Sequence, residues 1–241
     1  MNELAEAIAA SDRIVFFGGA GVSTESGIPD FRSGGGLYSK KIGDFTPEEV
    51  LSRSFFAAHP EEFFEYYRAN LLYPDAKPNP AHQALASLEQ AGKLTAVVTQ
   101  NIDGLHQLAG SRKVLELHGS VHRNTCVKCG RRYRLDTILA SAGIPTCSCG
   151  GIIKPDVVLY EESLDSGVMT AAAHYLSKAD LLIVGGTSLV VYPAAGLVQS
   201  YRGARLVVIN KQPTGMDHRA SLVLTDSIGE VLTSALAEMA D

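Results

Sequence analysis

The sequence runs Arg-Ile-Val-Phe-Phe-Gly-Gly-Ala-Gly from residue 13 to residue 21. Its first five residues are mostly apolar and β-prone, which is typical of a buried strand, and the glycines end that strand. Glycine amides after such a strand can approach a pyrophosphate closely, and the N-terminus of a following helix would add favourable partial charge. We therefore predict a nucleotide-binding turn here, against the alternative of a glycine-rich turn with no ligand.

Short apolar runs predict further buried strands, at residues 94–98, 114–117, 157–160, 181–184 and 206–209. Helical patterns lie before, between and after the strands, at residues 4–9, 46–49, 79–90, 169–178 and 228–239. Strands that alternate with helices indicate an α/β fold with a mostly parallel, doubly wound, Rossmann-like sheet.

Two stretches interrupt this alternation. Residues 33–75 are rich in glycine and then in aromatic residues, and residues 121–155 hold all four cysteines. We expect these stretches to form a smaller inserted domain, helical in the first part and zinc-binding in the second. The larger part would then consist of residues 1–32, 76–120 and 156–241.

The composition excludes several classes of protein. With 21 Lys and Arg against 26 Asp and Glu, the net charge is −5, which argues against a sequence-independent nucleic-acid binder. The longest nearly apolar run, residues 189–198, is far shorter than the roughly 18 residues of a membrane span. No charged-then-apolar leader is visible at the N-terminus. We expect a cytoplasmic monomer without membrane or nucleic-acid partners.

The four cysteines form two close pairs. Cys126 and Cys129 make a Cys-x-x-Cys, and Cys147 and Cys149 make a Cys-x-Cys after 17 intervening residues. Each pair can supply two adjacent corners of a tetrahedral zinc site, and a glycine after each pair allows a tight turn. Four sulfur ligands leave no open position, so we predict one structural zinc rather than four buried or redox-active thiols.

Polar or glycine-rich clusters follow the predicted strands. Besides the first turn, they are residues 99–106, 118–119, 185–188 and 210–211. The carboxyl ends of parallel strands face one crevice, so all five clusters are expected to meet there. Thr24 replaces the third glycine of the dinucleotide fingerprint, and no acidic residue is evident after the second strand. These two departures disfavour a simple hydride-transfer dehydrogenase.

The order and spacing of these motifs resemble the sirtuins, the NAD-dependent protein lysine deacylases, over essentially the whole chain. The resemblance is carried by Gly19 to Arg32, Thr99 to Asp103, His118-Gly119, the two cysteine pairs, Lys154 to Val158, and Gly186 to Ser188. It implies a reaction in which the acyl oxygen of a modified lysine attacks C1′ of the nicotinamide ribose and expels nicotinamide. Free lysine and O-acetyl-ADP-ribose follow, so the implied partners are acetylated proteins or peptides.

The resemblance also assigns roles to residues. His118 would be the base that accepts a proton from a ribose hydroxyl, with Asn101 as the second catalytic residue. Val157 and Val158 would pair with the substrate peptide, although they could equally be sheet core. The implied NAD-binding residues are Gly19, Ala20, Gly21, Thr24, Asp30, Phe31, Arg32, Gln100, Asn101, Ile102, Asp103, Gly186, Thr187, Ser188, Asn210, Lys211 and Ile228.

Simpler roles compete with these. Asn101 or Asp103 could merely cap the turn that leads to His106. The NAD chemistry could also serve an ADP-ribosyltransferase or an NAD glycohydrolase, whereas a non-catalytic NAD sensor would not need a base such as His118.

The sequence also bears on which acyl groups the protein would accept. Sirtuins that prefer negatively charged acyl chains share a Tyr-x-x-Arg pair, but Ala69 follows Tyr66 by three positions and Asn70 follows Tyr67. The sequence therefore predicts acetyl and other neutral acyl substrates.

Overall fold

The fold is centred on a six-stranded parallel sheet. The computed structural model describes residues 2–31, 36–37 and 44–240. The strand order in this sheet is β3-β2-β1-β7-β8-β9. The strands are β1 (Ile14–Gly18), β2 (Leu94–Thr99), β3 (Val114–Glu116), β7 (Leu181–Gly185), β8 (Arg205–Ile209) and β9 (Leu222–Leu224).

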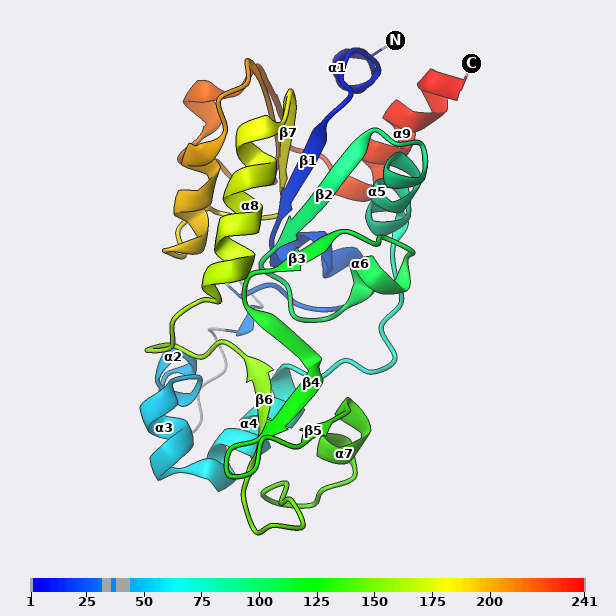
Figure 1. Ribbon diagram of the computed structural model, residues 1–241. Helices are drawn as coiled ribbons and strands as arrows, with labels where there is room; N and C mark the ends of the chain where they lie inside the picture. The colour runs from blue at the N-terminus through cyan, green and yellow to red at the C-terminus, as the bar shows by residue number, and fades with distance from the viewer. Residues whose placement is uncertain (1, 32–35, 38–43, 241) are drawn as a thin grey trace.

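Helices cover both faces of this sheet (Figure 1). One face packs against α1 (Glu3–Ala9), α5 (Pro80–Gln90) and α9 (Ile228–Ala240). The other face packs against α8 (Ser166–Lys178) and the 3-10 helix Ala194–Ser200. The predicted α/β, doubly wound class is therefore confirmed.

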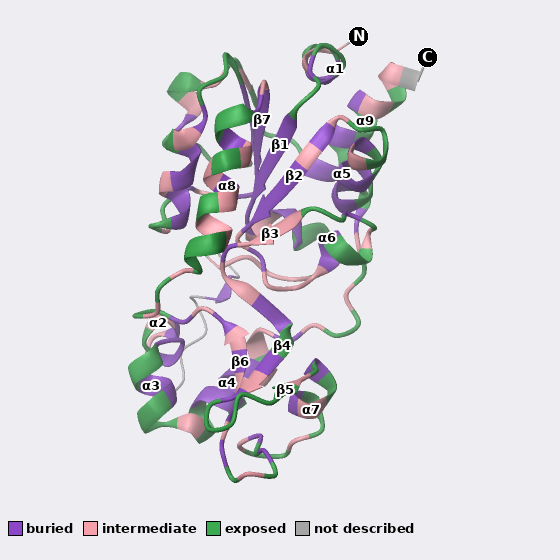
Figure 2. Ribbon diagram, in the orientation of Figure 1, coloured by how far each residue is buried: buried purple, intermediate pink, exposed green. Residues whose placement is uncertain are grey.

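The central strand β1 explains this arrangement. Ile14 and Phe16 belong to the core on one face, whereas Val15 and Phe17 belong to the core on the other, and none of the four is exposed. Successive side chains of a strand point to opposite faces, so a strand covered on both sides needs an unbroken apolar run. Figure 2 shows β1 buried along its length.

A second, smaller sheet lies below the first in Figure 1, in the order β5-β4-β6. Its antiparallel strands are β4 (Gly119–Cys126), β5 (Arg132–Tyr133) and β6 (Ile153–Val157). A third hydrophobic core joins this sheet to helices α2 (Pro47–Val50), α3 (Arg53–Ala58), α4 (Pro60–Asn70) and α7 (Leu135–Leu139). Thr46 and Glu49 form a capping box at the start of α2. Other helical elements in the described residues are short: α6 (Leu105–Leu108) and the 3-10 turns Ala20–Val22, Thr24–Ser26 and Asp217–Arg219.

The predicted strand at 157–160 is wrong. The strand found there is β6, which ends at Val157 and belongs to the small antiparallel sheet. Lys154 and Asp156 are half-buried between fully buried neighbours, and this alternation hides the strand from a search for continuous apolar runs. The edge strand β9 was not predicted either.

No helix in the described part of the chain is long and apolar enough to cross a membrane. The residue boundaries expected for the inserted domain stay a prediction.

Gly119 joins the two sheets, and its backbone geometry predicts that a side chain at this position lowers the free energy of unfolding. Its φ is +78°, and a Cβ there would overlap the carbonyl oxygen of Asp156 on β6. A non-glycine residue in the left-handed region costs about 1–3 kcal/mol before any overlap. We expect Gly119→Ala to lose at least about 2 kcal/mol of unfolding free energy in urea denaturation. Gly143→Ala, where the added methyl meets open space, should stay within about 0.5 kcal/mol of the parent. Equal stabilities would contradict the account of this junction.

Candidate functional site

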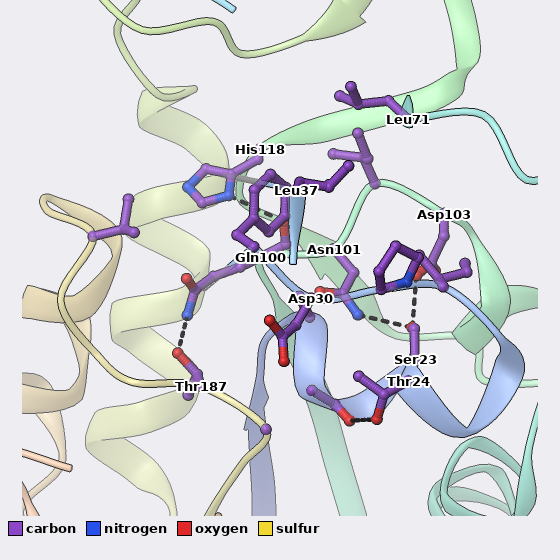
Figure 3. Close-up of a pocket in the computed structure, with 18 of the residues that line it drawn as sticks. Ser23, Thr24, Asp30, Leu37, Leu71, Gln100, Asn101, Asp103, His118 and Thr187 are labelled. Carbon is purple, nitrogen blue, oxygen red and sulfur yellow. Dashed lines mark hydrogen bonds between the residues drawn. The ribbon is translucent and has the colours of Figure 1, made fainter. Parts of the chain in front are cut away.

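A cavity of about 640 Å³ lies where the carboxyl ends of the parallel strands meet the smaller sheet. Four of the five predicted clusters contribute several residues each to its lining, and His118, labelled in Figure 3, comes from the fifth. The predicted site residues that line it are Ala20, Gly21, Thr24, Asp30, Phe31, Gln100, Asn101, Ile102, Asp103, His118, Val157, Val158, Gly186, Thr187, Ser188, Asn210, Lys211 and Ile228. Arg32 lies outside the described residues.

The glycine turn after β1 packs against the turn after β7. The amide of Gly19 donates to the Gly185 carbonyl at 3.2 Å, and that of Gly21 donates to the Gly186 carbonyl at 2.9 Å. A Cβ on Gly21 would lie 2.7 Å from Gly186 Cα, so only glycine permits this approach. Gly19 itself does not line the cavity, because it faces Thr187 and Gly186. Its predicted role in cofactor binding stays a prediction.

The chain after this turn differs from the expected helix. It forms two 3-10 turns, Ala20–Val22 and Thr24–Ser26, and Gly27 then takes a left-handed φ of +83°. The Thr24 hydroxyl donates back to the Gly21 carbonyl at 2.9 Å. These short turns therefore bend the loop around the cavity instead of aiming one long helix dipole at it.

A hydrogen-bond chain fixes the residues after β2. Asn101 Nδ2 donates to Ser23 Oγ at 3.0 Å, and Ser23 Oγ donates to Asp103 Oδ2 at 2.7 Å (Figure 3). Sequence reasoning missed Ser23, although it lies inside the glycine-rich run that carried the resemblance. Asp103 also accepts the Leu105 amide at 2.9 Å, so the capping role considered for it is present as well.

Gln100 follows β2 and links it to three other strand ends. Its side-chain amide donates to Thr187 Oγ1 at 3.0 Å, and its backbone amide donates to the Gly18 carbonyl at 3.0 Å. Its own carbonyl lies 3.0 Å from His118 Nδ1. The clusters that follow β1, β2, β3 and β7 are thus connected through one residue.

One hydrogen bond and partial burial determine the tautomer and the protonation state of the His118 imidazole. A carbonyl oxygen can only accept, so Nδ1 must carry the hydrogen in the contact with Gln100, and the neutral ring keeps its lone pair on Nε2. Burial lowers the pKa of His118, although its hydrogen bond to Gln100 opposes that shift. The ring is therefore neutral at physiological pH and able to accept a proton.

The end of β6 forms the opposite wall. Val157 pairs with Gly119, and the Val158 amide donates to the His118 carbonyl at 3.0 Å. Val157 also belongs to the third core, so it is both sheet core and cavity wall, as the sequence left open.

The far end of the cavity is polar. Asn210 Nδ2 donates to the Gln212 carbonyl at 2.6 Å, which fixes the turn after β8. Glu25, which was not predicted, accepts the Gly229 amide at 3.2 Å and ties the first loop to the start of α9 beside Ile228.

The four cysteines converge as predicted. Their Sγ atoms all lie within 4.8 Å of one another, with 3.5 Å between Cys126 and Cys149 and 3.6 Å between Cys129 and Cys147. Zn–S bonds of about 2.3 Å in a tetrahedron place sulfurs about 3.8 Å apart, so the cluster fits one Zn²⁺. Hydrogen bonds from the Cys149 amide and the Tyr133 hydroxyl lower the pKa of the Cys147 thiol to about 6, which favours the thiolate.

Comparisons with known proteins agree with this site. A model described as the Sir2 family matches residues 19–193. A Clostridium perfringens protein named NAD-dependent protein deacetylase is 63% identical over 96% of each chain. A Staphylococcus aureus protein of the same name is 43% identical over 99% of this chain and 98% of its own.

Solved structures are similar over the same length. A structure of Sir2 with a p53 peptide and NAD⁺ is 41% identical, with a TM-score of 0.86 over 99% of this chain and 98% of that one. A Sir2 homolog in complex with NAD is 38% identical, with a TM-score of 0.89 over 100% of this chain and 94% of that one.

The cysteine cluster predicts one zinc ion per chain, measurable by elemental analysis. Structural zinc contributes about 10–16 kcal/mol of binding energy that is coupled to folding, so Cys129→Ser should lose the metal and unfold the small sheet. Val127→Ser changes an exposed side chain of the same loop and should keep the zinc. Fully active, folded protein without zinc would contradict the assignment.

Proposed function

The chain belongs to the Sir2 family, and from that premise we propose that it is an NAD-dependent protein lysine deacetylase. It would transfer the acetyl group of an acetylated lysine to ADP-ribose and release nicotinamide and O-acetyl-ADP-ribose. The observation that carries this proposal is the cavity in which a neutral, half-buried histidine meets the turns after five parallel strands. Such a cavity can hold an extended dinucleotide along the strand ends and a peptide along β6.

We assign the proton transfer to His118. When bound, NAD supplies the ribose that accepts the acyl group and the nicotinamide that leaves. Nε2 of His118 would accept the proton of the ribose hydroxyl, because Nδ1 is held by the Gln100 carbonyl. Asn101, Ser23 and Asp103 would position the nicotinamide end, since their hydrogen-bond chain fixes polar groups in the same cavity.

The two ends of the cavity suit the two substrates. Thr187, Ser188 and Asn210 offer hydroxyl and amide groups to the adenosine half, next to Lys211 and Ile228. An extended peptide would add a strand beside Val157 and Val158, and its acetyl-lysine would then point toward His118. The role of each of these residues stays a proposal, as do the monomeric state, the cytoplasmic location and the absence of nucleic-acid partners.

The first test replaces the proposed base. We expect His118→Ala to fold normally but to lose about 10²–10⁴-fold in kcat, the usual loss when a general base is removed. His174→Ala, an exposed histidine on α8, is the matched control and should retain full activity.

The pH profile tests the same residue independently. Burial lowers the pKa of His118 from its ordinary value of about 6.5, so the ring stays neutral at pH values somewhat below 6.5. Activity should fall only when the pH drops through this lowered pKa. The acidic limb of kcat/KM should therefore lie below pH 6.5. In the first test, near-normal turnover of the His118→Ala variant would mean that another residue is the base.

The second test concerns the acyl group. Arg68, which follows the two tyrosines directly in the sequence, donates to the carbonyls of Ile138 and Gly143 near α7. Tyr66 and Tyr67 are themselves buried in the third core. The side chains of Leu37, Leu71 and Leu135 in the cavity lining are apolar (Leu37 and Leu71 are labelled in Figure 3).

A succinyl carboxylate would thus be buried without a cationic partner, at a large desolvation cost. We expect kcat/KM for a succinyl peptide to be at least about tenfold below that for the acetyl form of the same peptide, with butyryl nearer to acetyl. Faster removal of succinyl would show that a cation reaches the acyl group, which would contradict this prediction.

A further inference from the structure

A second hollow of about 550 Å³ adjoins the cavity on the side of α2 and α3. Tyr160 and Glu161 line both spaces, so the hollow continues from the wall along which the substrate peptide is proposed to lie. A side chain that flanks the acetylated lysine could therefore enter it. This inference rests on the proposed deacetylase function.

The shared wall is held in a defined position. The Tyr160 amide donates to the Leu51 carbonyl at 2.9 Å, and the Arg53 amide donates to the Tyr160 carbonyl at 3.0 Å. Glu161 adopts a φ of +71°, which is uncommon for a residue other than glycine. Its carboxylate accepts the amide of Ser54 at 2.9 Å and the Ser54 hydroxyl at 2.8 Å. These bonds keep the hollow at a fixed distance from the peptide path.

Three rings form an aromatic lining in the hollow. The centroid of Phe55 lies 4.9 Å from that of Phe45 and 4.9 Å from that of His59. Phe45 is nevertheless 40% exposed, and Tyr160 beside it is 39% exposed. Exposed aromatic faces attract cations, and a planar guanidinium stacks on them especially well.

The charges around these rings are negative. Glu48, Glu49 and Glu161 line the hollow, and among its described lining residues there is no lysine or arginine. The Glu49 carboxylate accepts the Thr46 amide in the capping box of α2, and that of Glu161 accepts the Ser54 amide. Glu48 is half-buried on the first turn of α2 and adds a third carboxylate.

We propose that this hollow binds an arginine side chain that flanks the acetylated lysine in the substrate protein. The aromatic rings would stack on the guanidinium, and the carboxylates of Glu48 and Glu161 would accept its hydrogen bonds. The hollow thus selects substrates by sequence, whereas the main cavity selects the acyl group.

The test compares arginine with citrulline, which has a similar shape but no charge. Acetyl-lysine peptides carry one or the other at each position within four residues of the lysine, and kcat and KM are measured for each. At one or two positions on one side, arginine should lower KM about threefold to tenfold with kcat unchanged. The difference should shrink in 0.5 M salt, because the hollow is open to solvent.

Variants locate the effect. Glu48→Gln and Phe45→Ala should each reduce the preference for arginine to less than about twofold. Glu65→Gln removes an exposed carboxylate of α4 outside the hollow and should leave the preference intact. Equal KM values for arginine and citrulline at every position would overturn the inference, as would a preference that survives both variants. Turnover of the citrulline peptides reports on the deacetylase function separately, and its complete absence would contradict that function as well.

Discussion

The contact between the backbones of Gly21 and Gly186 is the constraint on which the site depends. The amide of Gly21 donates to the Gly186 carbonyl at 2.9 Å, with no room for a side chain on either residue. Their turns follow β1 and β7, which are neighbours in the parallel sheet and end at the same edge. Because the two turns touch, the loop after β1 curves over the cavity while Thr187 and Ser188 form its other rim. A larger residue at either glycine would push the loop after β1 away from the rim formed by Thr187 and Ser188.

The proposed base is attached to this frame through Gln100. That residue bonds β1 through its backbone amide, Thr187 through its side chain, and His118 through its carbonyl. His118 in turn precedes Gly119, where the small sheet begins. The base therefore stands at the junction of the two sheets, between the space suited to a dinucleotide and the wall suited to a peptide. A shift of either sheet would therefore move Nε2 of His118 relative to both the dinucleotide space and the peptide wall.

Much of the fold and of the site could be predicted from the sequence, and one physical reason explains both the correct and the wrong strand predictions. Strands buried on both faces, such as β1 and β7, must be continuously apolar, so they are visible in one sequence. Strand β6 alternates buried and half-buried residues and was misplaced, because a search for continuous runs does not detect it. In the site, whole clusters were predicted from the ends of strands. Ser23 was missed because its role depends on Asp103, 80 positions away, and that contact exists only once the sheet has formed.

The most direct measurement of the central claim is the balance of products. An acetyl-lysine peptide would be incubated with the protein and NAD, and nicotinamide, free lysine peptide and O-acetyl-ADP-ribose would be quantified by mass spectrometry. The account predicts equal amounts of all three, and none of them when either NAD or the peptide is left out. Release of nicotinamide without the acetylated peptide would instead indicate a glycohydrolase or an ADP-ribosyltransferase. That result, or intact peptide across a broad panel of sequences, would contradict the assignment.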